Sequence, residues 1–251
     1  MTLDLIRHWN AAAARLKHAR IVGLFLDFDG TLARLRPRPE EANMDGAIRR
    51  TLALLATSSR FRVWIVSGRR LHDLRQRAHI PRVRYLGLHG WEGRGRGRLS
   101  RPSEQALRKV AVILQSVQRA PIWIEDKQYS LSVHYRGAVP ADRAAARAAI
   151  ETALEPFAKQ LRIQPGHSVW EILPRELEDK GAAVKQRLAY LGPASAAIYV
   201  GDDMMDETAF ATMPKGVTIR VGPPATSHAR YHLAGVTQVA WFLNRLREDL
   251  A

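Results

Sequence analysis

The sequence has no cysteine, no long apolar run and far fewer acidic than basic residues. Without cysteine, a disulfide scaffold, a thiolate metal site and a cysteine nucleophile are all excluded. No stretch approaches the roughly 20 apolar residues of a transmembrane helix. Charged residues between Met1 and Arg20 also argue against a signal peptide. We therefore expect a cytoplasmic protein that does not enter a membrane.

The excess of basic residues predicts an anionic partner. Lysine and arginine number 39 and aspartate and glutamate 24, which gives a formal charge of +15. Phosphorylated small molecules and nucleic acids both suit such a charge. The arginines are spread along the chain, however, and their one cluster, Arg94 to Arg98, has no interleaved aromatic residues for base stacking. We therefore expect a small-molecule ligand rather than nucleic acid, bound by a monomer.

Apolar runs alternate with helical patterns in both outer parts of the chain. Strands are predicted over residues 21–26, 63–66, 196–200 and 217–221, and helices over residues 3–17 and 47–56. The helical segments between strands are the crossovers that parallel pairing requires. The pattern predicts an α/β fold with an open, Rossmann-like parallel sheet, which binds ligands beyond the carboxyl ends of its strands.

The middle of the chain has a different pattern. Strands over residues 122–124, 129–135, 161–163 and 169–173 accompany an alanine-rich helix over residues 141–158. Such short, alternating strands are typical of an antiparallel sheet with one face packed on helices. We predict an α+β insert, residues 93–172, within a core formed by residues 1–92 and 173–251. Residues 93–102 would form the linker, and Trp123 and Trp170 the core of the insert.

Acidic and hydroxyl side chains follow three of the predicted core strands. The first strand leads into Asp27-Phe28-Asp29-Gly30-Thr31, the second into Ser67, and the third into Gly201-Asp202-Asp203. Asp27 and Asp202 can supply the oxygen ligands that a hard cation such as Mg²⁺ prefers. This ion, Ser67, Lys180 and backbone amides could together neutralise a transferring phosphoryl group. The pattern therefore predicts phosphoryl transfer from a monoester.

In this order the motifs resemble those of the haloacid dehalogenase superfamily. The resemblance implies that Asp27 is the nucleophile, which forms a phosphoaspartyl intermediate. Asp29 would protonate the leaving alkoxide and then deprotonate the hydrolytic water. Ser67 and Lys180 would bind phosphoryl oxygens. The long interval between Ser67 and Lys180 agrees with an inserted cap domain.

The resemblance also implies a magnesium site. Its ligands would be Asp27, the backbone carbonyl of Asp29, and Asp202, with Asp203 or Asp206 as helpers. We expect further substrate contacts from residues in the same loops, namely Gly30, Thr31, Gly68 and Arg69.

Further motifs resemble those of trehalose-6-phosphate phosphatases, from about Leu24 to Phe210. They are Gly87-Leu88-His89-Gly90-Trp91-Glu92, Lys127 with Ser130, His134-Tyr135-Arg136, and Glu171-Ile172-Leu173-Pro174. The resemblance implies hydrolysis of trehalose 6-phosphate in trehalose biosynthesis. Its sugar contacts would come from Glu92, Lys127, His134, Arg136 and Glu171.

Two departures from that family leave the substrate open. Leu173 stands where a basic residue is frequent, and Met205 where threonine or serine is usual. A related phosphatase for sucrose phosphate or mannosylglycerate phosphate is therefore an alternative, and a nucleic-acid-binding phosphatase is a third.

Several of these residues also have structural interpretations. Ser67 could cap the following helix, and Asp203 and Asp206 could stabilise a helix N-terminus. Lys180 lies among acidic residues and could be a solvated surface charge.

Overall fold

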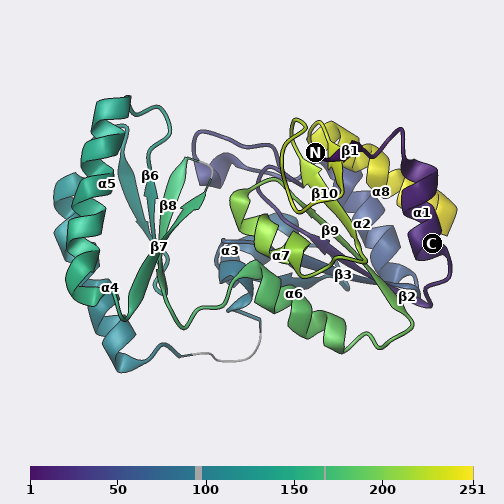
Figure 1. Ribbon diagram of the computed structural model, residues 1–251, viewed down its shortest axis with the longest axis horizontal. Helices are drawn as coiled ribbons and strands as arrows, with labels where there is room; N and C mark the ends of the chain where they lie inside the picture. The colour runs from purple at the N-terminus through teal and green to yellow at the C-terminus, as the bar shows by residue number, and fades with distance from the viewer. Residues whose placement is uncertain (94–97, 167, 251) are drawn as a thin grey trace. The chain divides into compact units, whose positions relative to one another are not determined.

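The computed structural model describes residues 1–93, 98–166 and 168–250 (Figure 1). The chain divides into two compact units. The core unit comprises Met1–Gly95 and Asp179–Ala251, and the insert unit comprises Arg96–Glu178. The predicted boundary after residue 172 falls inside a strand of the insert unit, Val169–Pro174. Among the described residues, no helix has the length and apolar character to cross a membrane.

Seven parallel strands form the sheet of the core unit, which confirms the predicted α/β fold. Their spatial order is β1 (Leu3–Asp4), β11 (Tyr231–Leu233), β10 (Val217–Val221), β9 (Ser195–Gly201), β2 (Ile21–Leu26), β3 (Phe61–Val66) and β4 (Arg84–Leu86). The inner strand β2 is buried from Val22 to Leu26 because helices cover both faces of the sheet.

The helices of the core unit lie on opposite faces of this sheet. One face packs against α1 (Trp9–Lys17), α2 (Gly46–Thr57), α3 (Leu71–Ala78) and α8 (Val236–Leu250). The other packs against α6 (Lys180–Ala189) and α7 (Glu207–Ala211), around Phe25, Trp64 and Tyr199. Both faces of β2 and β3 are therefore held in place, which makes the ends of these strands rigid supports for a site.

The prediction of one helix over residues 3–17 was wrong at its start. Leu3 and Asp4 form β1, which pairs in parallel with β11, and the helix begins only at Trp9. The Asp4 carboxylate accepts hydrogen bonds from the backbone N–H groups of Ile6 and Arg7, which turns the chain between strand and helix.

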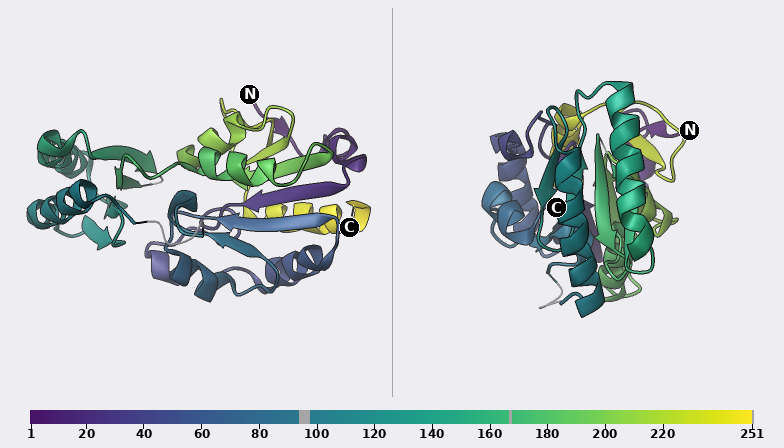
Figure 2. Two further views of the ribbon diagram at one scale, coloured as in Figure 1. Left: turned by 90° about the horizontal axis from the view of Figure 1, so that it is seen from below. Right: turned by 90° about the vertical axis from the view of Figure 1, so that its left-hand side faces the viewer.

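The insert unit contains an antiparallel sheet with helices on one face. The strand order is β5 (Trp123–Asp126), β6 (Leu131–His134), β8 (Val169–Pro174) and β7 (Leu161–Gly166). The right-hand view of Figure 2 shows α4 (Arg101–Leu114) and α5 (Pro140–Leu154) side by side. Their buried residues pack with Leu131, Val133 and Ile172 of the sheet.

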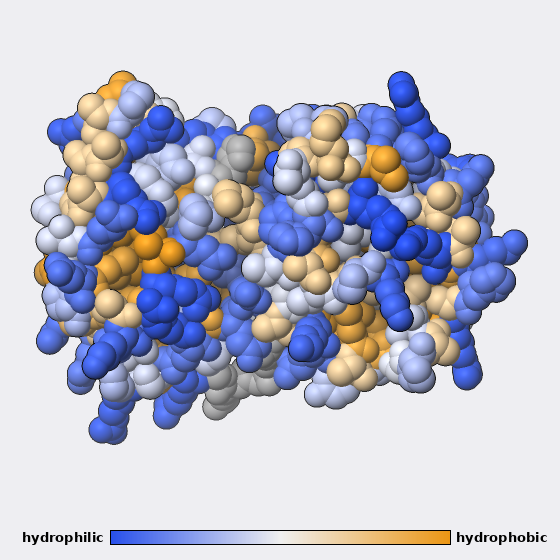
Figure 3. Space-filling view, viewed as in Figure 1, coloured by the Kyte–Doolittle hydropathy of each residue, from blue (hydrophilic) through white to orange (hydrophobic). Residues whose placement is uncertain are grey.

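Part of the predicted linker is helical. Ser100 caps α4 by accepting a hydrogen bond from the backbone N–H of Ser103, and Pro102 lies in the first turn, where its missing N–H costs nothing. Residues 94–97, most of the arginine-glycine cluster, lie outside the described residues. On the face seen in Figure 3, hydrophilic residues cover most of the surface, in keeping with the charge of +15.

Candidate functional site

Three adjacent strands, β9, β2 and β3, end at the same edge of the core sheet. Asp27 directly follows β2, Ser67 follows β3, and Asp202 follows β9. The backbone N–H of Asp27 donates to the carbonyl of Val200 at 2.9 Å, which extends the β2–β9 pairing to the first site residue. The parallel sheet therefore brings together residues that are far apart in the sequence.

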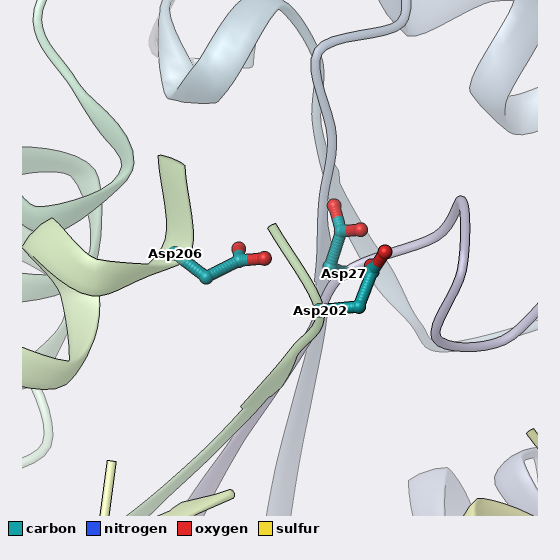
Figure 4. Close-up of side chains that lie close together, drawn as sticks. All are labelled: Asp27, Asp202 and Asp206. Carbon is teal, nitrogen blue, oxygen red and sulfur yellow. The ribbon is translucent and has the colours of Figure 1, made fainter. Parts of the chain in front are cut away.

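Three carboxylates meet at this edge, with a lysine between two of them. Oxygens of Asp27, Asp202 and Asp206 lie within 4.8 Å of one another (Figure 4). The Lys180 ammonium donates to Asp27 Oδ1 at 2.7 Å and to Asp206 Oδ1 at 2.7 Å. Lys180 is only 3% exposed, so it is not the solvated surface charge that its acidic neighbours in sequence allowed.

Asp206 is the most constrained of the three carboxylates. Its Oδ1 also accepts a hydrogen bond from the Tyr199 hydroxyl at 2.7 Å, and its Oδ2 accepts the backbone N–H of Asp203 at 2.9 Å. A Cβ at Gly201 would overlap the Asp206 carboxylate, so glycine is required at the end of β9. Asp206 therefore holds Lys180 in position, with both of its oxygens already bonded.

The structure does not bring Asp203 into this group. Its carboxylate accepts the backbone N–H of Met204 and caps the short 3-10 helix η5 (Met204–Asp206). The acidic group contains Asp206, one turn later, which faces Asp27, and the expected role of Asp203 as a metal ligand stays a prediction.

The electrostatics of the cluster favour a divalent cation. Burial, opposed by Lys180, raises the pKa of Asp27 to about 7. Burial and the neighbouring Asp27 likewise raise the pKa of Asp202 well above its usual range. Burial would lower the pKa of Lys180, but Asp206 and Asp27 together raise it. With all groups ionised, one ammonium leaves an excess of two negative charges, which a divalent ion bound by carboxylate oxygens would neutralise.

Asp29 lies beside this cluster but faces a different partner. Arg69 binds both of its carboxylate oxygens at 2.7 Å, in a two-pronged ion pair. Arg69 also binds Asp73 at 2.7 Å and the carbonyl of Pro39. Arg69 therefore holds the Asp29 side chain, and its expected contact with substrate stays a prediction.

The loops after β2 and β3 shape the rest of the core site. Gly30 has a φ of +82°, and a Cβ there would overlap the Asp202 carboxylate. The Thr31 hydroxyl donates to Asp202 Oδ1 at 3.2 Å. Ser67 is buried and its hydroxyl accepts the backbone N–H of Arg69, while Gly68 lies against the ring of His89. These contacts keep the expected substrate-loop residues Gly30, Thr31 and Gly68 tightly packed.

Glu92 belongs to the core unit and supports the start of α3. Its carboxylate accepts the backbone N–H of Leu71 at 2.5 Å and pairs with Arg70 at 3.3 Å. The bonds that are described for Glu92 are therefore structural, and its expected sugar contact stays a prediction.

A row of polar side chains crosses one face of the insert sheet. Strand register aligns Glu125 with Ser132, Ser132 with Glu171, and Glu171 with Gln164. The opposite face carries the apolar residues that pack on α4 and α5. Alternation in residues 131–135 already placed Ser132 on the polar face, but its pairing with Glu171 required the strand register.

Of the expected sugar contacts of the insert, Glu171 lies in this row, and Lys127 and His134 bond to its members. Lys127 and Ser132 bind the two oxygens of Glu171 at 3.0 and 2.8 Å. His134 bonds to Glu125 at 3.0 Å, and its ring stacks on Trp123 with centroids 4.0 Å apart. Arg136 follows β6 and is half-buried.

The prediction that both insert tryptophans belong to the core was right for one of them. Trp170 lies in the apolar cluster of the insert unit. Trp123 was predicted wrongly, because it lies half-buried on the polar face beside His134.

An open parallel sheet with acidic residues at its strand ends and an α+β insert between β4 and α6 defines the haloacid dehalogenase-like fold. The chain belongs to the trehalose-phosphatase family, whose model matches residues 25–235. This confirms the resemblance inferred from the motifs.

Relatives from bacteria and fungi show the same likeness. The chain is 33% identical to the trehalose-phosphate phosphatase of Mycobacterium tuberculosis, over 92% of this chain and 63% of that protein. It is 33% identical to the trehalose-6-phosphate phosphatase of Escherichia coli, over 90% of this chain and 86% of that protein. The solved C-terminal domain of the Candida albicans trehalose-6-phosphate phosphatase has the same fold, with a TM-score of 0.83 and 22% identity over 99% and 98% of the two chains. This chain thus spans less than two thirds of the mycobacterial protein.

Proposed function

We propose that this protein is a Mg²⁺-dependent phosphatase that hydrolyses trehalose 6-phosphate to trehalose and phosphate. The observation that carries the proposal is the buried Lys180 bound to Asp27, with Asp202 beside them, at the end of the central strands. Membership of the trehalose-phosphatase family supports the substrate. A sequence without cysteine suits the reducing cytoplasm, where we propose that the enzyme acts on a free sugar phosphate.

In the proposed reaction an Asp27 carboxylate oxygen attacks phosphorus, and the bond from phosphorus to the sugar oxygen breaks. The leaving alkoxide takes a proton from Asp29, and the phosphoryl group is then carried by Asp27. A water molecule next attacks phosphorus and gives a proton back to Asp29, which releases phosphate and restores Asp27. Lys180 would balance charge on the phosphoryl oxygens, since its ammonium already lies 2.7 Å from Asp27.

The ion pair between Asp29 and Arg69 must change before the proposed proton transfer can occur. Both oxygens of Asp29 accept hydrogen bonds from Arg69, so at least one of these bonds must open before Asp29 can donate a proton to the leaving group. Arg69 would then be free to bind a substrate oxygen, as its guanidinium is always charged.

Asp27 and Asp202 are the residues that would bind Mg²⁺, with Thr31 and Gly30 positioning Asp202. When bound, the ion would supply positive charge for the phosphoryl oxygens. We propose that Asp206 contributes indirectly, by holding Lys180.

The polar face of the insert sheet supports a sugar substrate. Carboxylates such as Glu171 accept hydrogen bonds from sugar hydroxyls, and Lys127 can donate to hydroxyl or ring oxygens. Lys127 and Glu171 bind each other at 3.0 Å, so a sugar bound to either side chain would share or replace this ion pair. We propose that the insert unit acts as a cap, which binds the disaccharide and excludes water.

Phosphate release from four compounds, with Mg²⁺ and with EDTA, tests the proposal. The panel would contain trehalose 6-phosphate, sucrose 6-phosphate, glucose 6-phosphate and a 5′-phosphorylated oligonucleotide. We expect kcat/KM to favour trehalose 6-phosphate by about a hundredfold or more, equivalent to about 2.7 kcal/mol, and to require Mg²⁺. Equal rates on all four compounds would contradict the substrate, and full activity in EDTA would contradict the metal.

Glu171→Gln should separate sugar recognition from phosphoryl transfer. Glutamine can still accept a hydrogen bond from Ser132 or Lys127, so the sheet should persist, but the charge that binds hydroxyls is lost. We expect KM for trehalose 6-phosphate to rise about tenfold, with little change on p-nitrophenyl phosphate, which has no sugar. Glu151→Gln, on the outward side of α5, is the matched control. Equal losses on both substrates would remove Glu171 from the sugar site.

A further inference from the structure

A pocket separate from the phosphatase site lies at the β4 edge of the core unit. Its volume is about 720 Å³, within the range of small-molecule sites. Of the eleven residues that line it, four are arginines and none is acidic; the arginines are Arg62, Arg75, Arg84 and Arg187. None of the residues of the phosphatase site described above is among them.

The pocket includes residues from the amino-terminal ends of β3 and β4, away from the phosphatase site. Arg62 is the second residue of β3 and Arg84 the first of β4, whereas the catalytic groups follow the carboxyl ends of the strands. From Arg62 to Ser67 the chain advances about 16 Å at the usual rise of a strand. A molecule in the pocket would therefore not be a substrate bound at Asp27.

Three of the four pocket arginines form no ion pair with an acidic side chain in the described part of the chain. No carboxylate of the described residues forms an ion pair with Arg62, Arg75 or Arg84, although many arginines elsewhere do, as Arg69 and Arg77 do with Asp73. Arg62 is held by the carbonyls of Ser59 and Phe61. Positive charges that are gathered in a concave surface attract anions strongly.

Trp64, one of three aromatic residues that line the pocket, is not available for stacking on a nucleic-acid base. Trp64 is only 5% exposed, stacks on Phe25 with ring centroids 4.7 Å apart, and has the Arg84 guanidinium over its ring at 5.2 Å. Trp64 therefore has no ring face open for the base stacking that binding of single-stranded nucleic acid requires. Tyr190, which is 77% exposed, is the most exposed aromatic residue of the pocket. The Trp64 ring also positions the guanidinium of Arg84, whose side chain is exposed to solvent.

We propose that this arginine pocket binds a small molecule that carries two or more linked phosphoryl groups. A guanidinium group donates paired hydrogen bonds that match phosphate oxygens, and linked phosphoryl groups offer oxygens to more of the four arginines than a single phosphate does. The ligand class, an oligophosphate, is distinct from the monoester of the proposed reaction.

The test is isothermal titration of the full-length, metal-free protein with tripolyphosphate and, separately, with ATP, both in EDTA. Without metal, the phosphatase site carries an excess of carboxylates and should repel these anions, so binding reports the arginine pocket. The test variant is Arg75→Glu/Arg84→Glu, because both side chains are exposed and neither forms an ion pair with a described residue. The control is Arg15→Glu/Arg50→Glu, an equal change of charge at exposed positions on α1 and α2.

We expect one saturable site in the natural protein, binding about tenfold weaker or more in the Arg75/Arg84 variant, and within about twofold of the natural value in the Arg15/Arg50 control. Tighter binding of ATP than of tripolyphosphate would identify a nucleotide, and equal binding the phosphate chain alone. The absence of saturable binding, or equal weakening in both variants, would overturn the proposal. So would tighter binding of a 5′-phosphorylated oligonucleotide than of either compound. Circular dichroism checks folding, and Arg75→Gln/Arg84→Gln replaces the test variant if the glutamates unfold it.

Discussion

Asp27→Asn is expected to abolish phosphate release while leaving the protein folded. Asparagine has nearly the shape of aspartate and can still accept the hydrogen bond from Lys180, but its amide is not a nucleophile. We expect kcat to fall by at least about 10⁴-fold, as removal of a covalent nucleophile does in other enzymes. The measurement is phosphate release from trehalose 6-phosphate under saturating Mg²⁺.

The same substitution has a predictable effect on stability. Burial raises the pKa of Asp27 to about 7, so the ionised side chain is less favourable in the folded than in the unfolded protein. The contribution of Asp27 to the stability of the metal-free protein should therefore fall as the pH rises from about 4 to about 7, because Asp27 loses its proton first in the unfolded state. Asp27→Asn should reduce this fall and, in EDTA at pH 8, melt at the same or a higher temperature than the natural protein.

Two observations would contradict the role of Asp27. One is turnover in Asp27→Asn above about a hundredth of the natural rate. The other is the absence of a phosphoryl mass increment on the peptide containing Asp27 when the natural enzyme is quenched in acid during turnover. Asp142→Asn, on the surface of the insert unit, is the control for loss of an aspartate.

Of the variants at Asp27, Lys180 and Lys185, Lys180→Met is expected to lose the most stability. Lys180 is 3% exposed and its ammonium is the common partner of Asp27 and Asp206, so its removal leaves buried carboxylates uncompensated. Breaking a buried ion pair from one side costs about 3–5 kcal/mol. We expect a loss of this size in the free energy of unfolding, measured with urea in EDTA at pH 8.

A double variant shows whether the loss arises from charge. In Lys180→Met/Asp206→Asn one of the unpaired carboxylates is gone, so we expect recovery of at least about 1 kcal/mol relative to Lys180→Met. Lys185→Met, the same substitution at an exposed position of α6, is the control and should be nearly neutral. A loss in Lys180→Met no greater than in Lys185→Met would contradict the buried ion pair.

Lys180→Met should also lose activity in the presence of Mg²⁺. If the ammonium neutralises phosphoryl oxygens, kcat should fall by about 10²–10³-fold, the usual effect of removing one such group. A fall in stability without a fall in kcat would assign Lys180 to folding alone.

Local sequence predicted the core strands well because their burial leaves a direct signature. A strand covered on both faces is a continuous apolar run, as in residues 21–26, and it stops where polar loop residues begin. Where the local pattern failed, a capping or turn side chain had decided the structure. The Asp4 carboxylate interrupts the expected first helix, and Ser100 starts a helix within the expected linker.

The candidate site was predicted in part. The order of Asp27, Ser67, Lys180 and Asp202 indicated which strand ends would carry polar groups, because parallel strands end at one edge. The sequence could not show which of Asp203 and Asp206 joins the site, because both are aspartates and both follow Asp202 closely. The turn of η5 decides between them, since Asp203 caps this turn while Asp206 faces Lys180.

By itself, the sequence determined the class of fold, the strand ends that bear carboxylates, and the excess of positive charge. These follow from periodicity, residue type and chain order, which are local properties. Only the tertiary structure decided the partners: Arg69 for Asp29, Glu125 for His134, and the separate gathering of arginines beside Trp64. Such contacts join residues from different strands and loops. The pattern of neighbouring residues in the sequence does not encode the distance between such residues.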